Sequence, residues 1–255
     1  SLPHFSEDPA LHDQLESGRK KRKSKLKATD VMASLAPVYG PVQWEPRYSA
    51  AEELVYTILS QHTSDINSGR AFQNLMSTFG SLDRVAAASR ESIECAIWRG
   101  GLAKQKSANI KAVLNEVHEE VGSYDLSFLS EMPLPEAKAW LTRFRGVGPK
   151  TAAIILCFAL GMPAMPVDTH IYRVAQRLGL VGRKVSADAA HDILEPMVQP
   201  ADVFAFHVYL IEHGRQVCKA QLPRCDECVL AKVCPSAGKV YGAKGRGRRR
   251  RPSRR

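Results

Sequence analysis

The chain has 255 residues, of which 36 are Lys or Arg and 26 are Asp or Glu, so its formal net charge is +10. This length allows one large or two small domains with a buried core. No apolar run approaches the roughly 20 residues of a membrane span, and the N-terminus lacks the charged-then-apolar order of a signal peptide. We therefore expect a protein of the cytoplasm, nucleoid-associated if bacterial, that does not enter membranes.

The positive charge is concentrated in two short segments. Residues 19–27 hold seven Lys or Arg and residues 239–255 hold nine, and neither segment contains an acidic residue. The remaining chain has 20 basic and 26 acidic side chains, so it is mildly acidic. Basic tails suit an anionic polymer and bind it in a salt-sensitive way, although solubility alone is an alternative. We expect disordered basic tails over 1–24 and 238–255.

Between the tails, apolar residues recur at helical spacing and no segment alternates as a strand would. The first predicted helix, over 29–36, is expected to end at Pro37 and Gly40. The sequence therefore predicts an all-α fold. The ten further predicted helices cover residues 50–60, 66–79, 81–89, 90–98, 106–121, 135–144, 149–160, 169–178, 186–197 and 201–213.

Two glycines one residue apart, Gly146 and Gly148, separate two of these helices. They allow a tight hairpin, and Pro149 fits the first position of the following helix. Backbone N–H groups at a helix start can hold a DNA phosphate without reading sequence. An ordinary helix–helix turn is the alternative interpretation of the same residues.

Two polar residues stand at the starts of predicted helices. Lys150 lies just inside one start, where the helix dipole disfavours a cation and favours the neutral amine that a Schiff-base nucleophile requires. A lysine that only contacts phosphate is the alternative. Asp168 precedes the helix over 169–178, where Asp is a preferred N-cap. A carboxylate near a lysine could also activate the amine and stabilise a cationic sugar.

Four cysteines, Cys218, Cys225, Cys228 and Cys234, lie within 17 residues with gaps of six, two and five. Four thiolates in so short a segment can enclose a compact iron–sulfur cluster or an all-thiolate zinc site. Two disulfides are the alternative, and they are disfavoured where thiols stay reduced.

The cysteine spacing and the segment FRGVGPKTAAIIL resemble those of the endonuclease III family of DNA glycosylases. The resemblance covers about residues 50–236. It implies two helical domains with a DNA-binding cleft between them. A central domain over 51–165 would carry a helix-hairpin-helix motif, and segments 25–50 and 166–237 would form the second domain. It also implies a [4Fe–4S] cluster on the C-terminal cysteine loop.

The resemblance assigns roles to individual residues. The lysine of GVGPKTA and the aspartate of VDTH would be the catalytic pair, with His170 in support. His62 in LSQHTSD would fill the gap left by an extruded base, Leu102 would be the apolar wedge, and Asp65 would brace the loop. The residues implied as catalytic, DNA-binding or supporting are Lys150, Asp168, Gly146, Val147, Gly148, His62, Leu102, Lys219, Arg224, Asp65 and His170.

The family's function is expected to follow. We expect a bifunctional DNA glycosylase and AP lyase that acts as a monomer on double-stranded DNA containing damaged bases, above all oxidised pyrimidines, or abasic sites. His62 departs from the family, which usually has Gln at this position, so the contact with the orphaned base is expected to differ. Two alternatives are a monofunctional mismatch, uracil or adenine glycosylase, whose members generally lack this lysine, and a non-catalytic iron–sulfur protein that binds DNA.

Overall fold

A computed structural model describes residues 26–239, and over this range every regular element is a helix, which confirms the all-α prediction. No helix in this range is long and apolar enough to cross a membrane. Both basic tails lie almost entirely outside these residues. The α-helices are α1 (Ala28–Tyr39), α2 (Ala50–Ser60), α3 (Asp65–Phe79), α4 (Leu82–Ala87), α5 (Arg90–Ile97), α6 (Ala103–Val121), α7 (Leu134–Thr142), α8 (Pro149–Ile154), α9 (Thr169–Leu178), α10 (Ala187–Leu194) and α11 (Val203–Gln216).

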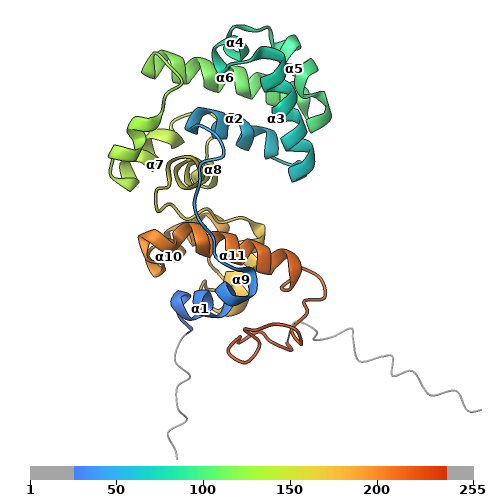
Figure 1. Ribbon diagram of the computed structural model, residues 1–255, viewed down its shortest axis with the longest axis vertical. Helices are drawn as coiled ribbons and strands as arrows, with labels where there is room; N and C mark the ends of the chain where they lie inside the picture. Colours follow the sequence, from blue (N-terminus) through green and yellow to red (C-terminus); the bar gives the residue numbers. More distant parts are fainter. Residues whose placement is uncertain (1–25, 240–255) are drawn as a thin grey trace, which may run out of the picture.

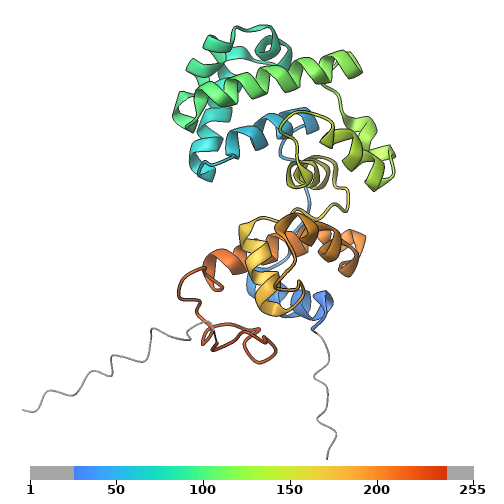
Figure 2. The same cartoon turned by 180° about the vertical axis from the view of Figure 1, so that it is seen from behind.

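The helices gather in two groups (Figure 1). In one group α2 packs on α3, α3 on α5, and α6 on α4 and α5; in the other, α11 packs on α1 and α9. Figure 2 shows the same separation from behind, with α8 where the groups meet. Helix α8 contacts α2, α7 and α10, so it joins the two groups. The exact domain bounds, 51–165 for one domain and 25–50 with 166–237 for the other, stay a prediction.

Serine side chains explain why several helices begin where the sequence pattern places them. Ser49 accepts a hydrogen bond from the Glu52 N–H at 3.3 Å, while the Glu52 carboxylate accepts from the Ser49 N–H at 2.9 Å. This reciprocal cap satisfies two backbone donors that the first turn leaves without partners. At the starts of α3, α4, α5 and α10, the side chains of Ser64, Ser81, Ser89 and Ser186 likewise accept a hydrogen bond from a backbone N–H of the first turn.

Several predicted boundaries are wrong, among them those of α1, of α6 and of the helix that begins at Pro149. Helix α1 continues past Pro37 to Tyr39 and ends at Gly40, so the one backbone hydrogen bond that Pro37 cannot donate does not end the helix. Helix α6 begins at Ala103 rather than at 106, directly after Leu102. The helix that begins at Pro149 changes at Ile155 into a π-helical turn, Ile155–Ala159, a feature often found at functional sites.

Candidate active site and cysteine loop

Lys150 and Asp168, the two predicted catalytic residues, line one pocket. Lys150 is the second residue of α8 and is exposed, and Asp168 precedes α9 and is half-buried. The pocket wall also contains residues of α2 and α11. An amine and a carboxylate that open onto the same cavity can act on one bound group.

The carboxylate of Asp168 has a fixed direction. Its Oδ1 accepts a hydrogen bond from the Ile171 N–H at 2.7 Å, so Asp168 is the N-cap of α9. The cap predicted from the sequence is therefore confirmed. The cap occupies one carboxylate oxygen, Oδ1, and the residue itself lines the pocket. His170, predicted to support this site, has its Nδ1 3.1 Å from Arg173 Nη2.

The glycine hairpin lies directly before Lys150. Gly146 has φ 83°, a conformation that favours glycine, and no side chain caps the start of α8. Gly146 and Gly148 are exposed, and a Cβ added to either would meet open space. Val147 differs: its side chain is buried in the core and its N–H donates to the Phe144 carbonyl at 3.1 Å. Of these three residues, only the two glycines present open backbone.

Four residues of the pocket wall carry no signal in the sequence. Arg47, Tyr56, Phe158 and His207 line the same cavity as Lys150. Arg47 lies in the segment between α1 and α2, where no helical pattern or motif marks it. The other three lie on helices, at positions where the sequence pattern is equally compatible with an ordinary core residue. Only the folded chain brings them together.

His207 is buried and lines this pocket. Its Nδ1–H donates to the Pro166 carbonyl at 3.0 Å, since the carbonyl can only accept. Burial lowers the pKa of His207 to about 4; the hydrogen bond to Pro166 and the carboxylate of Asp168 act in the opposite direction, and Lys150 lowers the pKa further. The ring is therefore neutral at physiological pH and forms an uncharged part of the pocket wall that Lys150 and Asp168 also line.

At the rim of the pocket, Asp65 joins α3 to α11. Its Oδ2 accepts a hydrogen bond from Arg215 Nη2 at 2.7 Å. Asp65 itself is the first residue of α3, and the cap of this helix is Ser64. The ion pair spans 150 positions of sequence, so it holds the loop before α3 against α11.

Two exposed residues, His62 and Leu102, lie in loops with left-handed backbone. Their φ angles are 54° and 52°, and the Leu102 side chain is 54% exposed. Such a conformation is costly for a non-glycine residue and persists only where the surroundings hold it. The buried ammonium of Lys106 donates to the Leu59 and Gly100 carbonyls at 2.6 and 3.0 Å. This one side chain therefore holds both loops.

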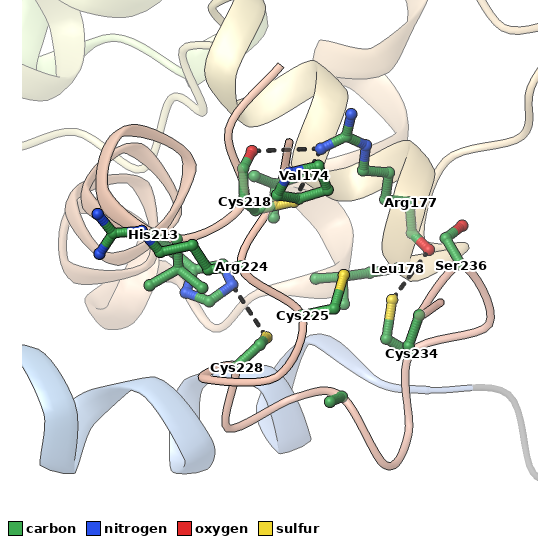
Figure 3. Close-up of a pocket in the computed structure, with 14 residues that line it drawn as sticks. Val174, Arg177, Leu178, His213, Cys218, Arg224, Cys225, Cys228, Cys234 and Ser236 are labelled. Carbon is green, nitrogen blue, oxygen red and sulfur yellow. Dashed lines mark hydrogen bonds between the residues drawn. The ribbon is translucent and has the colours of Figure 1, made fainter. Parts of the chain in front are cut away.

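The four cysteines of the C-terminal loop line a second pocket (Figure 3). Val174, Arg177, Leu178 and His213 line it too, so α9 and α11 form the other walls. All six cysteines of the chain are free, which leaves the disulfide alternative without support. Within residues 26–239, no three or more His, Cys, Asp or Glu side chains converge closely enough to hold a single metal ion.

Polar groups surround the sulfur atoms. Arg177 Nη1 lies 3.4 Å from Cys218 Sγ, and His213 Nε2 lies 3.5 Å from Cys228 Sγ. Burial raises the pKa of the Cys228 thiol and of the Cys234 thiol. Hydrogen-bond donors around sulfur ligands tune an iron–sulfur cluster, so these contacts suit four cysteines that act as ligands.

The predicted DNA contacts of this loop, Lys219 and Arg224, are both exposed. Arg224 Nη1 lies 3.4 Å from Glu227 Oε2, an exposed pair that contributes little to stability. Arg177 holds the backbone beneath them, because its Nη1 donates to the Lys219 carbonyl at 2.7 Å and its Nη2 to the Ala220 carbonyl at 3.0 Å. The structure thus presents both cations on a braced loop.

Residues 55–200 match the family model for the HhH-GPD superfamily of base excision DNA repair proteins. The chain is 32% identical to endonuclease III of Synechocystis over 221 residues, which span 86% of this chain and 96% of that protein. It is 33% identical to endonuclease III of Sulfolobus acidocaldarius over 183 residues, 71% of this chain and 79% of that one. A protein of Arabidopsis thaliana named as a putative DNA glycosylase is 36% identical over 192 residues, which span 71% of this chain but only 65% of its own length.

Solved structures of DNA glycosylases have the same fold as this chain. A trapped covalent intermediate of endonuclease III with DNA superposes with a TM-score of 0.72 and 25% identity, over 84% of this chain and 98% of that one. A thermostable thymine-DNA glycosylase, 18% identical over 83% of this chain and 97% of its own, superposes with a TM-score of 0.69. At that identity, the second match shows shared architecture alone.

Proposed function

We propose that this chain, which belongs to the HhH-GPD superfamily of base excision DNA repair proteins and is an endonuclease III-like DNA glycosylase, excises oxidised pyrimidines and then cleaves the abasic site. The observation that carries the proposal is the pocket shared by Lys150 and Asp168. An amine there can replace the base on the sugar, and a carboxylate can stabilise the positive charge that develops meanwhile.

In the proposed reaction, the neutral amine of Lys150 attacks C1′ of the extruded nucleotide. The bond between C1′ and the base breaks, the base leaves with the bonding electrons, and it takes up a proton. Asp168 stabilises the cationic sugar during this exchange, with its carboxylate directed by the Ile171 N–H.

The second half of the proposed reaction cleaves the strand. The sugar ring opens to an imine between C1′ and the lysine nitrogen. This Schiff base makes the C2′ proton acidic. Loss of that proton forms a double bond between C2′ and C3′ and expels the 3′ phosphate, which is β-elimination. Hydrolysis of the imine then restores Lys150.

The proposed partner is a single duplex that contains a damaged base or an abasic site, bound by a monomer across the face between the two helix groups. The exposed backbone at Gly146 and Gly148 suits a phosphate. His62 and Leu102, exposed in their braced loops, would occupy the space vacated by the extruded nucleotide. Lys219 and Arg224 would add cationic contacts to the DNA backbone.

We also propose that the cysteine loop holds a [4Fe–4S] cluster on Cys218, Cys225, Cys228 and Cys234. The fit rests on four free thiols that line one pocket between α9, α11 and the loop. A bound cluster would cross-link the loop and supply a redox-active centre. The excision and elimination steps described above use other residues, so the loop's contribution to them is to hold Lys219 and Arg224 in place.

The experiment that tests this function uses duplexes that each carry one defined lesion, with excision and strand cleavage scored separately. We expect excision of oxidised pyrimidines and cleavage of the resulting abasic site by the same protein. Excision without cleavage would indicate a monofunctional glycosylase instead. Binding with neither reaction would indicate a non-catalytic DNA-binding protein.

A further inference from the structure

Arg47 forms a bidentate ion pair with a fully buried carboxylate in the wall of the active-site pocket. Its Nε and Nη2 donate to the two Glu53 oxygens at 2.9 and 2.5 Å. The Glu53 side chain is 0% exposed, whereas that of Arg47 is 43% exposed. The carboxylate therefore anchors the guanidinium from the protein side, and the rest of the arginine remains open to the outside.

Aromatic rings fix the plane of this guanidinium. Its Cζ lies 4.5 Å from the ring centre of Tyr56 and 5.2 Å from that of Phe158, and Tyr48 lies a little farther away at 5.6 Å. Tyr56 and Phe158 line the same pocket as Arg47. A guanidinium held by a carboxylate and stacked on rings has little freedom left to lose when it binds a ligand.

Hydrogen-bond donors remain available on the anchored group. The Glu53 carboxylate occupies Nε and Nη2, and within residues 26–239 Nη1 has no hydrogen-bond partner. A guanidinium has five N–H donors and no acceptor. The pocket that contains Lys150 and Asp168 is thus bordered by a rigid, cationic group whose free donors can be satisfied only by acceptor atoms.

We propose that Arg47 is a specificity-determining residue that recognises carbonyl oxygens of the extruded base. This inference rests on the proposed excision function and adds the class of base to it. The selected bases carry ring carbonyls on the edge facing Arg47, as uracil-derived and thymine-derived lesions do. An exocyclic amino group at that edge would place its N–H donors against the N–H donors of Arg47. Neither set of donors would then have an acceptor.

Two other roles for Arg47 predict different behaviour. If the ion pair served only to neutralise buried Glu53, changing Arg47 would lower stability and affect every substrate equally. If Arg47 contacted a DNA phosphate, its loss would weaken binding to all duplexes, abasic ones included. Recognition of the base predicts an effect that depends on which base is present and that disappears when there is none.

A matched pair of lesions tests the proposal. 5-Hydroxyuracil and 5-hydroxycytosine share the C2 carbonyl and differ along one edge: C4 carries a carbonyl oxygen or an amino group, and N3 carries a hydrogen only in the uracil. Single-turnover excision of each base and cleavage of a pre-formed abasic site are measured for the natural protein and for Arg47→Lys. This variant keeps a cation beside Glu53 but loses the planar set of guanidinium donors. Arg90→Lys is the control, because Arg90 is similarly exposed (46%) and pairs with Glu91 outside the pocket. Thermal melting checks the fold of each variant.

The natural protein should prefer 5-hydroxyuracil, and Arg47→Lys should reduce that preference about tenfold, in the range that a bidentate contact contributes to base discrimination. Abasic cleavage should stay within about twofold, and Arg90→Lys should change neither quantity. If Arg47→Lys does not fold, the double variant Arg47→Gln with Glu53→Gln, which leaves no unpaired charge, is measured instead. Equal losses on all three substrates, or an unchanged preference, would overturn the role of Arg47 alone. A natural protein that neither excises a base nor cleaves an abasic site would overturn the proposed function itself.

Discussion

Lys106 Nζ donates a hydrogen bond to Thr63 Oγ1 at 2.5 Å, and this contact joins the two loops whose exposed residues have left-handed backbone. Thr63 Oγ1 in turn donates to the Gly100 carbonyl at 2.7 Å. Lys106 is only 3% exposed, and burial lowers its pKa. A buried cation is costly unless its donors are satisfied, so its three acceptors fix the positions of His62 and Leu102 relative to each other.

Replacing this cation should disturb both stability and base extrusion. In Lys106→Met, the Leu59 carbonyl loses its bond from Nζ while buried, so we expect a loss of about 1–3 kcal/mol in unfolding free energy. Excision of a paired lesion should fall more than cleavage of an abasic site, because extrusion needs both loops. Lys111→Met is the control: Lys111 also donates to two carbonyls, at the end of α4, away from these loops. Equal effects of both variants on excision would contradict this role.

His207 should make stability depend on pH. Its pKa is about 4 in the folded protein, because of burial, and about 6.5 when unfolded. Between these values the unfolded chain binds more protons, so this contribution to stability is complete above pH 6.5 and is lost as the pH falls toward 4. We expect the melting temperature to decrease over that range, and less steeply in His207→Gln. The exposed His118→Gln variant should keep the original slope; equal slopes in all three proteins would refute the assignment.

The cysteine loop should hold iron. Four free thiols line its pocket, and we expect protein purified in air to be yellow-brown with about four iron atoms per chain. Serine in place of Cys225 should lower the iron content, while serine in place of Cys95, an exposed cysteine on α5, should not. Zinc without visible absorbance would contradict the cluster assignment.

His62 should influence the choice of lesion and not the chemistry. A neutral imidazole offers a stacking surface with one donor and one acceptor, whereas Gln offers two donors, one acceptor and no ring. His62→Gln should therefore change the ranking of opposite bases or lesions, while cleavage of a pre-formed abasic site stays within about twofold. Thr63 supports this position through Lys106 and is left intact. Equal loss on every substrate would instead show a structural or catalytic role.

Patterns among residues close together in the sequence predicted most of the helices and part of the candidate active site. Serine caps and apolar spacing located α2 and α3 to within one residue, and Asp168 caps α9 as its position before Thr169 suggested. Both depend on neighbours along the chain, which a sequence displays directly. Val147 could not be placed, because the same hairpin can point a side chain outward or, as observed, into the core.

The rest of the site depends on contacts between distant segments. Arg47 lies outside any helix, and Phe158, against which it stacks, is 111 positions away on the π-helical turn. Arg215 reaches Asp65 across 150 positions. No periodicity or spacing encodes such pairs, so the specificity role proposed for Arg47 was not visible before the chain was folded. The resemblance implied that Asp65 braces the loop, but its partner Arg215 became visible only in the structure.

The most direct measurement is borohydride trapping of the protein on a duplex with an oxidised pyrimidine, because reduction fixes a Schiff base between enzyme and sugar. The natural protein and the exposed control Lys184→Gln should become covalently linked to the DNA. Lys150→Gln should lose the cross-link while still binding the duplex, since the amine is the nucleophile and not the main source of affinity. Undiminished trapping by Lys150→Gln would mean that another amine attacks the sugar, and the assignment of Lys150 would be wrong.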